Sequence, residues 1–331
     1  MMSSIASLPA APRSMNRAKL VGVIGRLALP LVLVVLALIA NVLSHGTFLT
    51  PQNIVNVLTQ NSVLGVLAVG QTLIILTAGI DLSLGSLTAL AAVTILTMQG
   101  LGLVPSFAIG LGVGLTAGCV NGLLVSFGRV PPFIATLGMM QAAMGLAYVV
   151  SRGFSIDDHD HVGLMFGQDK LFGVIPSLVV IWALVALIGW FISRRTRYGS
   201  YIYAVGGNTR AAKMSGVPVN RVLIFVYAFA GLCAAVGAIL YINRFGNAEP
   251  GLGSIKTLSM SMAPVVVGGT SLFGGSGGVG KTIIGVLILG VLSNIMTLIG
   301  VPANPQQVVQ GVIILLVVFM FVDQERRSRN R

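Results

Sequence analysis

The stretch IIGVLILGVLSNIMTLIG, residues 283–300, contains no charged side chain. A helix needs roughly 20 apolar residues to cross a bilayer, so this stretch predicts a membrane span. The rest of the chain is similar: of its 331 residues, 55% are hydrophobic and 8% are charged. Soluble domains have about a quarter of their residues charged. The composition therefore predicts an all-α, polytopic membrane protein.

Apolar runs of span length recur along the whole chain. We expect about ten transmembrane spans, near residues 27–43, 54–80, 83–99, 105–127, 133–150, 174–193, 222–243, 258–273, 282–299 and 306–322. Two places in this series are irregular, the turn at 78–85 and the short span 258–273 that ends in GGTSLFGGSGG. Irregular backbone at membrane depth survives where it is buried or lines a wet cavity. These places are either walls of a pathway or ordinary tight turns.

The net charge of +12 is concentrated in three segments that flank apolar runs, residues 13–26, 194–221 and 326–331. This is the distribution of the positive-inside rule, and it argues against nucleic acid as the partner. An even number of spans then places both termini and the 194–221 loop in the cytoplasm. We expect a disordered basic cytoplasmic tail at 1–26, a membrane domain at 27–322 and a second basic cytoplasmic tail at 323–331.

The loop 194–221, RRTRYGSYIYAVGGNTRAAKMSGVPVNR, contains the signature of a short helix. Asn208 suits the N-cap, Gly216 suits a left-handed exit, and Pro218 prevents continuation. A short helix on the wet side of a membrane protein favours contact with another protein.

Residues Gly275–Thr282, GSGGVGKT, match the phosphate-binding pattern G-x-x-x-x-G-K-[ST]. A working phosphate-binding loop joins a strand to a helix in an α/β domain, whereas the residues after Thr282 form the apolar stretch quoted first. We therefore interpret the match as a false motif and expect no cofactor on this chain.

Isolated polar residues within the apolar runs are candidates for a solute pathway. Asp81 is the only acid before Asp157. It either has a functional role or belongs to the start of the following helix, which Asp81 or Ser83 would cap. The polar residues Asn61, Gln71, Asn121 and Asn294 either line a route for a hydroxyl-rich solute or form interhelical hydrogen bonds.

Two further patterns have structural interpretations. Gly110, Gly114, Gly118 and Gly122 recur every fourth residue, which predicts a smooth helix face for close packing. The outer-loop sequence 157–161, DDHDH, contains metal-ligand types, but adjacent residues point in different directions. We expect no metal there; contact with an extracytoplasmic protein fits this loop better.

Taken together, the motifs resemble the sugar-type permease subunits of bacterial ABC importers, the group that includes the ribose permease. The resemblance covers the chain from about residue 45. It rests on residues 70–73 (GQTL), 77–85 (TAGIDLSLG), 121–122 (NG), 131–138 (PPFIATLG), 206–216 (GGNTRAAKMSG) and 268–275 (GGTSLFGG). The departure is GKT at 280–282, which creates the false motif.

The resemblance implies a multipass subunit of the bacterial plasma (inner) membrane that imports a monosaccharide or related polyol. It implies a second permease copy or homologue, two separate ABC ATPase subunits and an extracytoplasmic sugar-binding protein as partners, beside membrane lipid. It also implies that a coupling helix docks on the ATPase. That helix comprises Asn208, Thr209, Arg210, Ala211, Ala212, Lys213, Met214, Ser215 and Gly216.

Two alternatives remain open. A stand-alone secondary transporter or channel would be expected to have more intramembrane charge than Asp81 supplies. A membrane-embedded enzyme would need a catalytic constellation, and the three histidines all fall in predicted outer loops.

Overall fold

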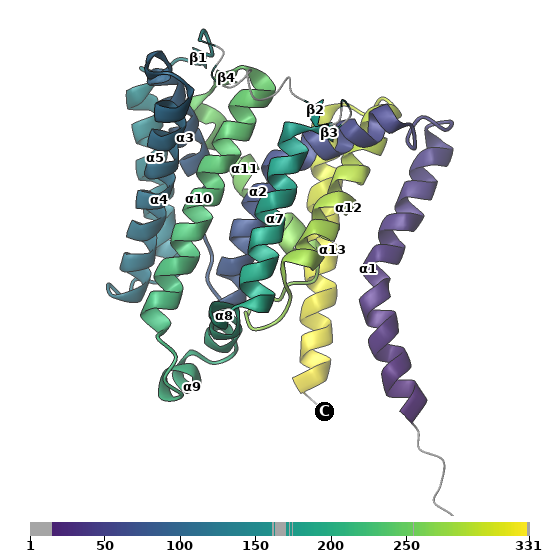
Figure 1. Ribbon diagram of the computed structural model, residues 1–331. Coiled ribbons are helices and arrows are strands. Elements are labelled where there is room, and N and C mark those ends of the chain that lie inside the picture. The colour runs from purple at the N-terminus through teal and green to yellow at the C-terminus, as the bar shows by residue number, and fades with distance from the viewer. Residues whose placement is uncertain are drawn as a thin grey trace, which may run out of the picture.

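The computed structural model describes residues 15–160, 162, 170, 171, 173, 175–253 and 255–329. Its elements form a bundle of roughly parallel helices (Figure 1). In chain order the helices are α1 (Met15–Leu43), α2 (Pro51–Leu76), α3 (Leu84–Thr97), η1 (Gln99–Leu101), α4 (Leu103–Ser126), α5 (Pro132–Val150), α7 (Ser177–Arg195), α8 (Arg197–Gly207), α9 (Thr209–Met214), α10 (Val219–Phe245), η2 (Pro250–Gly253), α11 (Ile255–Val267), α12 (Val279–Leu298) and α13 (Ala303–Arg329).

Two small antiparallel sheets lie at the end of the bundle opposite α8 and α9 (Figure 1). Strand β1 (Ile156–Asp157) pairs with β4 (Asn247–Ala248), and β2 (Lys170–Leu171) pairs with β3 (Ile175–Pro176). The first sheet ties the segment after α5 to the end of α10, so two connections distant in sequence are joined at one end.

Each of the ten predicted spans overlaps a helix, which confirms the all-α, polytopic membrane class, although 54–80 runs past the end of α2 and 258–273 runs past the end of α11. Within the part of the chain that the structure describes, six helices are long and apolar enough to cross a membrane: α2, α4, α5, α7, α10 and α12. The number of crossings and the side of each terminus stay predictions. Helix α1 begins at Met15, inside the stretch predicted as a tail, whereas residues 1–14 lie outside the described residues.

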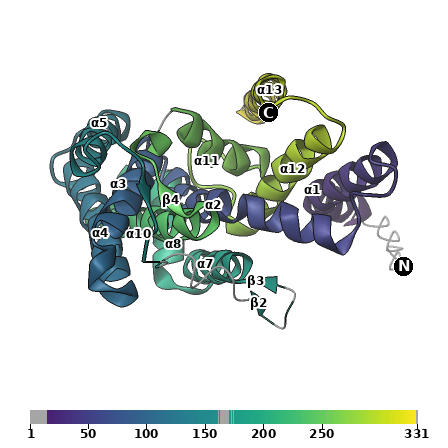
Figure 2. The same ribbon diagram turned by 90° about the horizontal axis from the view of Figure 1, so that it is seen from above.

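Helices α2, α3 and α10 form the centre of the bundle. The most apolar stretch of α2 is 72% buried, whereas those of α4 and α5 are 22% buried. Seen from above, α4 and α5 lie on one side, and α1 and α13 lie at the periphery near α12 (Figure 2). The outer helices expose apolar side chains, as expected for surfaces that face lipid or another membrane subunit.

The glycine face of α4 packs against α10 with backbone against backbone. A Cβ at Gly114 would collide with the Gly231 carbonyl oxygen, and one at Gly118 would collide with the Tyr227 carbonyl oxygen. A Cβ at Gly122 would lie 2.6 Å from the Ile224 Cα, and Gly110 faces Ile95 of α3. Small residues allow this approach, which maximises van der Waals contact where lipid offers no hydrophobic driving force.

Helices α3 and α11 are too short to cross a bilayer alone. Helix α3 has 14 residues, which span about 21 Å of the roughly 30 Å hydrocarbon core. It follows an irregular segment, residues 77–83, in which Ala78 has a left-handed φ of 61°. Helix α11 has 13 residues and is followed by the irregular segment 268–278. An irregular segment thus adjoins each of these short helices.

Candidate functional site

Helix α9 forms where the sequence predicts a short helix. The Asn208 side chain accepts a hydrogen bond from the Ala211 N–H at 3.0 Å, which caps the first turn. The helix ends through Gly216, whose φ is +79°, and the Val217 N–H donates to the Ala212 carbonyl at 3.0 Å. A positive φ is the conformation that glycine adopts without steric cost, so the exit depends on it.

One face of α9 is open and the other is packed on the subunit itself. Ala212 is 5% exposed and belongs to the main apolar core, whereas Met214 is 90% exposed. Ala211 and Lys213 are exposed as well. An isolated methionine at this exposure favours contact with a partner, since it is a flexible apolar side chain. The exposed residues of α9 are therefore Thr209, Arg210, Ala211, Lys213 and Met214, whereas Ala212 is buried.

Helix α8 precedes α9 and was not predicted from the sequence. Its buried side chains are Ile202 and Val205, which pack in the core with Leu76 and Val279. Intrinsic preference favours helix weakly here, because the sequence RYGSYIYAVGG contains three glycines and several aromatic and β-branched residues. Tertiary burial of one face forms this helix, and it fixes the position from which α9 projects.

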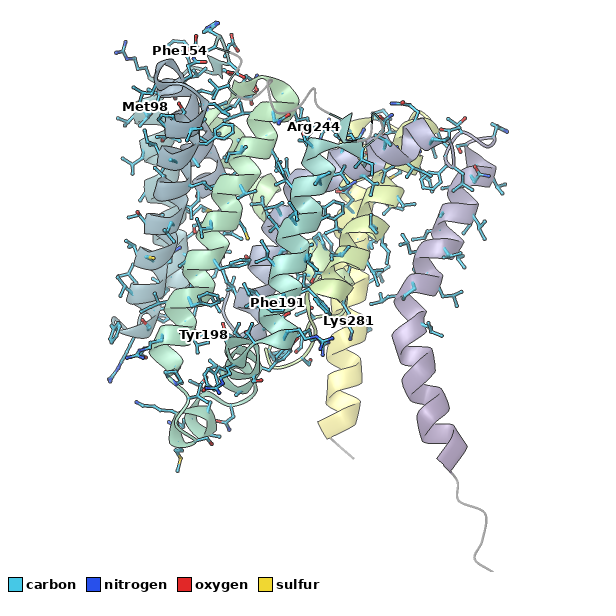
Figure 3. The ribbon with its side chains drawn as sticks, in the orientation of Figure 1. Met98, Phe154, Phe191, Tyr198, Arg244 and Lys281 are labelled. Atoms are coloured by element: carbon cyan, nitrogen blue, oxygen red, sulfur yellow. The ribbon has the colours of Figure 1, made fainter. Side chains whose placement is uncertain are left out.

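Helices α8 and α9 lie at the end of the bundle that also holds the N-terminal end of α1 and the C-terminal end of α13 (Figure 1). Lys281 lies near this end, whereas Arg244 lies at the opposite end (Figure 3). The predicted cytoplasmic segments therefore share one end of the molecule.

Asp81 lies in a buried polar cluster in the irregular segment 77–83. One carboxylate oxygen accepts from the Ser83 N–H at 2.7 Å and from the Ser83 hydroxyl at 2.6 Å. The Asn121 amide donates to the Ser83 hydroxyl at 3.0 Å, which links this segment to α4. The other Asp81 oxygen, Asn121 Oδ1 and the Tyr227 hydroxyl are buried without a hydrogen-bond partner among the described residues. Asp81 thus fixes the turn that leads into α3, and its second carboxylate oxygen is available to accept a hydrogen bond.

The other three polar candidates are scattered along the bundle. Asn294 of α12 forms a reciprocal pair with Asn53 of α2, with bonds of 2.9 and 3.0 Å. Asn61 donates to the Val57 carbonyl of its own helix at 2.7 Å. Gln71 is fully buried, and its amide atoms have no partner in the described part of the chain. The five predicted pathway residues therefore do not form one cluster; only Asp81 and Asn121 are linked, through Ser83.

Two polar pairs between helices are not predicted from the sequence. Asn53 bonds Asn294, and the Thr72 hydroxyl lies 2.8 Å from that of Thr282. A polar residue inside a predicted span was the available signal. The pairing itself depends on tertiary contacts between segments more than 200 positions apart.

The segment that matches the phosphate-binding pattern connects two helices. Residues 268–278 follow α11, and α12 begins at Val279. The Gly275 N–H donates to the Leu76 carbonyl at 3.0 Å, and the Gly278 N–H donates to the Thr270 hydroxyl at 3.2 Å. The Thr282 hydroxyl is buried against Thr72. A phosphate site needs such groups free to face the anion, and here they are bonded within the protein.

The sequence 157–161, predicted as an outer loop, begins in strand β1. The Asp158 N–H donates to the Gly246 carbonyl at 2.9 Å, and the Asp158 carboxylate accepts from the Val162 N–H at 2.7 Å. His161 lies outside the described residues. Among those described, no three His, Cys, Asp or Glu side chains come together as a possible metal site.

Comparison with known proteins gives one family and several close relatives. The family model described as "Branched-chain amino acid transport system / permease component" matches residues 53–318. The ribose import permease protein of Escherichia coli (strain K12) is 41% identical over 87% of this chain and 91% of its own length. That of Bacillus subtilis (strain 168) is 40% identical over 90% and 93%. The fructose import permease protein of Rhizobium meliloti is 37% identical over 90% and 85%. No solved structure matches the chain.

Proposed function

This chain belongs to the family of ABC permease components and is the permease subunit of a sugar importer, and we propose that its substrate is a monosaccharide or a related polyol. The relatives are named for ribose, fructose and D-allose. A sugar of five or six carbons is common to these three names. The identities of 35–41% do not choose among the three.

We further propose that α9 is the docking point for the ATPase subunits that supply the energy. The exposed surface formed by Ala211, Lys213 and Met214 carries this proposal. It projects from the end of the bundle where the predicted cytoplasmic segments meet (Figure 1). In the phosphate-binding-like segment the N–H groups of Gly275 and Gly278 are bonded within the protein, and we propose that an external ATPase supplies the energy for uphill transport.

The remaining parts of the assembly follow from the same proposal. A second permease copy or homologue completes the membrane unit, and an extracytoplasmic binding protein delivers the sugar to the opposite end, which carries β1 and β4. The bacterial inner membrane is the proposed location, with about ten crossings and both termini on the side of α9.

The charge at position 211 tests the docking proposal. We expect Ala211→Asp to abolish co-purification of the ATPase, because an acid in a packed protein contact loses its hydration without a partner. The matched control is Ala211→Ser, which is polar and small but uncharged and should retain the ATPase. Position 212 is unsuitable, since Ala212 is buried in the subunit's own core.

Two outcomes separate the possibilities. Ala211→Asp that retains the ATPase as fully as the unaltered chain refutes docking on α9. Sugar accumulation by the chain alone, without any ATPase or ATP, refutes the importer proposal as a whole and favours a stand-alone transporter.

A further inference from the structure

Three backbone segments meet directly at the end of the bundle that carries α9. They are residues 76–78 at the end of α2, Gly206–Gly207 at the end of α8, and Gly274–Gly275; together they are called the backbone junction here. The Gly275 N–H donates to the Leu76 carbonyl at 3.0 Å. A Cβ at Gly206 would collide with this same carbonyl oxygen and would lie 2.7 Å from the Gly275 nitrogen.

The junction leaves no room for side chains between its segments. A Cβ at Gly274 would lie 2.9 Å from the Gly206 carbonyl oxygen and 2.8 Å from the Ala78 nitrogen. A Cβ at Gly275 would lie 3.0 Å from the Gly207 Cα. Such backbone-to-backbone contacts transmit displacement with little loss, since no flexible side chain lies between them.

A side-chain link reinforces the junction one turn earlier on α8. The Tyr203 hydroxyl donates to the Gly277 carbonyl at 3.0 Å, and the Arg194 guanidinium lies 5.9 Å from the centre of the Tyr203 ring. Burial raises the pKa of the Tyr203 phenol, opposed by Arg194, so the phenol remains a donor at neutral pH. Helix α8 is therefore attached to the segment 268–278 at two levels.

The junction connects α9 on one side to irregular membrane segments on the other. A single residue, Asn208, separates α8 from α9, and the Thr209 hydroxyl donates to the Val205 carbonyl at 2.9 Å. Leu76 leads into the segment 77–83, which contains Asp81. Gly275 leads into α12, and the chain before it leads back to α11. Chain connections and hydrogen bonds thus link α9 through the backbone junction to the segments that precede α3 and α12.

We propose that the backbone junction carries the movement of α9 to the segments 77–83 and 268–278, and that Gly206 is the positioning residue on which this transmission depends. The proposal rests on ATPase docking at α9. It assigns Gly206 and Tyr203 to coupling and not to docking or to sugar binding. Packed elements with two discrete arrangements are the form in which distant sites are coupled.

Two adjacent glycines provide a matched test. A Cβ at Gly206 meets the junction, whereas one at Gly207 meets nothing within 4 Å. Both lie in the last turn of α8, so Gly206→Ala and Gly207→Ala gain the same helix preference. We would reconstitute each variant with its ATPase and binding protein and measure sugar transported per ATP hydrolysed. We expect Gly206→Ala to lower this ratio by about fivefold or more, with the ATPase still bound, and Gly207→Ala to match the unaltered chain.

Tyr203→Phe is the second variant, and it tests the coupling proposal if the Gly206→Ala complex does not assemble. It removes the hydroxyl that bonds Gly277 and keeps the ring under Arg194, so it should also lower the ratio without loss of ATPase binding. ATPase retention is scored first. An unaltered chain that does not retain its ATPase refutes the proposed function, and the coupling proposal falls with it. If the Gly206→Ala complex assembles and its ratio of sugar transported to ATP hydrolysed is unchanged, the coupling proposal is overturned and the proposed function stands. If Gly206→Ala does not assemble, an unchanged ratio in Tyr203→Phe has the same meaning.

Discussion

Helix α9 and the glycine-rich segment 268–278 lie near the same end of the bundle, and they use their backbone groups in opposite ways. In α9, local caps satisfy both helix ends, and Met214 remains 90% exposed. In the segment 268–278, the N–H groups of Ser271, Gly275 and Gly278 all donate to acceptors within the protein. Helix α9 exposes side chains to a partner, whereas these N–H groups of the segment 268–278 form hydrogen bonds within the protein.

This difference shows why two sequence signals of similar strength lead to different conclusions. The pattern at 275–282 has every residue of a phosphate-binding loop, but binding requires backbone donors that are free to face an anion. The pattern at 208–216 only requires a helix that is capped locally, and local caps can be read from the sequence. A motif is informative about binding only when the groups it supplies remain available.

The largest expected effect is on the free energy of unfolding. It is tested by a glycine-to-alanine substitution in the segment 268–278 and another at the end of α9. Gly277 has φ of +124°, and a Cβ there would lie 2.6 Å from Thr270 Cα. We expect Gly277→Ala to destabilise the chain by about 3 kcal/mol through strain and overpacking. Gly216 has φ of +79° but open space around it, so Gly216→Ala should cost only about 1 kcal/mol. Thermal unfolding in detergent measures both, and equal losses would contradict the contrast between the regions.

Removal of the exposed methionine should weaken ATPase binding without affecting the fold. We expect Met214→Ala to lower the affinity for the ATPase about tenfold, as truncation of an apolar interface anchor commonly does. The control is Met98→Ala at the opposite end of the bundle (Figure 3), which should leave the affinity unchanged. Titration of the ATPase onto detergent-solubilised chain supplies the measurement; equal affinities for the two variants would argue against a contact at Met214.

The N-cap of α9 should contribute less to the affinity for the ATPase than the exposed Met214 side chain does. Asn208→Ala removes the acceptor for the Ala211 N–H and should cost about 1 kcal/mol of local helix stability. If α9 docks as a formed helix, ATPase affinity falls by about fivefold. Asn208→Ser restores a capping oxygen and should recover most of the affinity. The same titration tests this, and failure of Ser to rescue would show that Asn208 acts by direct contact and not as a cap.

The smallest expected effect is at the phosphate-binding-like segment. Isolated chain without its partners should show no ATP binding, and Lys281→Ala should leave that result unchanged. Equilibrium dialysis with labelled ATP provides the test. Saturable micromolar binding that Lys281→Ala removes would show that the segment 275–282 is a working nucleotide site.

Much of the fold was accessible from the sequence because bilayer spans and helix caps are local signals. The apolar stretch at 283–300 predicts α12, and the four glycines from Gly110 to Gly122 mark a face that packs closely in the structure. Asn208 and Gly216 mark the ends of α9. Each of these features depends on residues within a few turns of one another.

The missed features depend on contacts between distant segments. Helix α8 forms because Ile202 and Val205 find buried positions against other helices, which its own weak helix preference does not reveal. The importance of Gly206 arises only when Leu76 and Gly275 are placed beside it. In the same way, the sequence shows Asn53 and Asn294 as isolated amides, and only the bundle brings them together.

The central claim is that α9 is the contact point of the ATPase, and photo-crosslinking within the assembled importer tests it most directly. A photo-reactive amino acid would replace Met214 at the tip of α9 or, as control, Met98 at the opposite end of the bundle (Figure 3). The claim predicts an ATP-binding subunit crosslinked to position 214 and none crosslinked to position 98. Absence of this product at position 214 in a complex that still transports sugar, or its appearance at position 98, would contradict the claim.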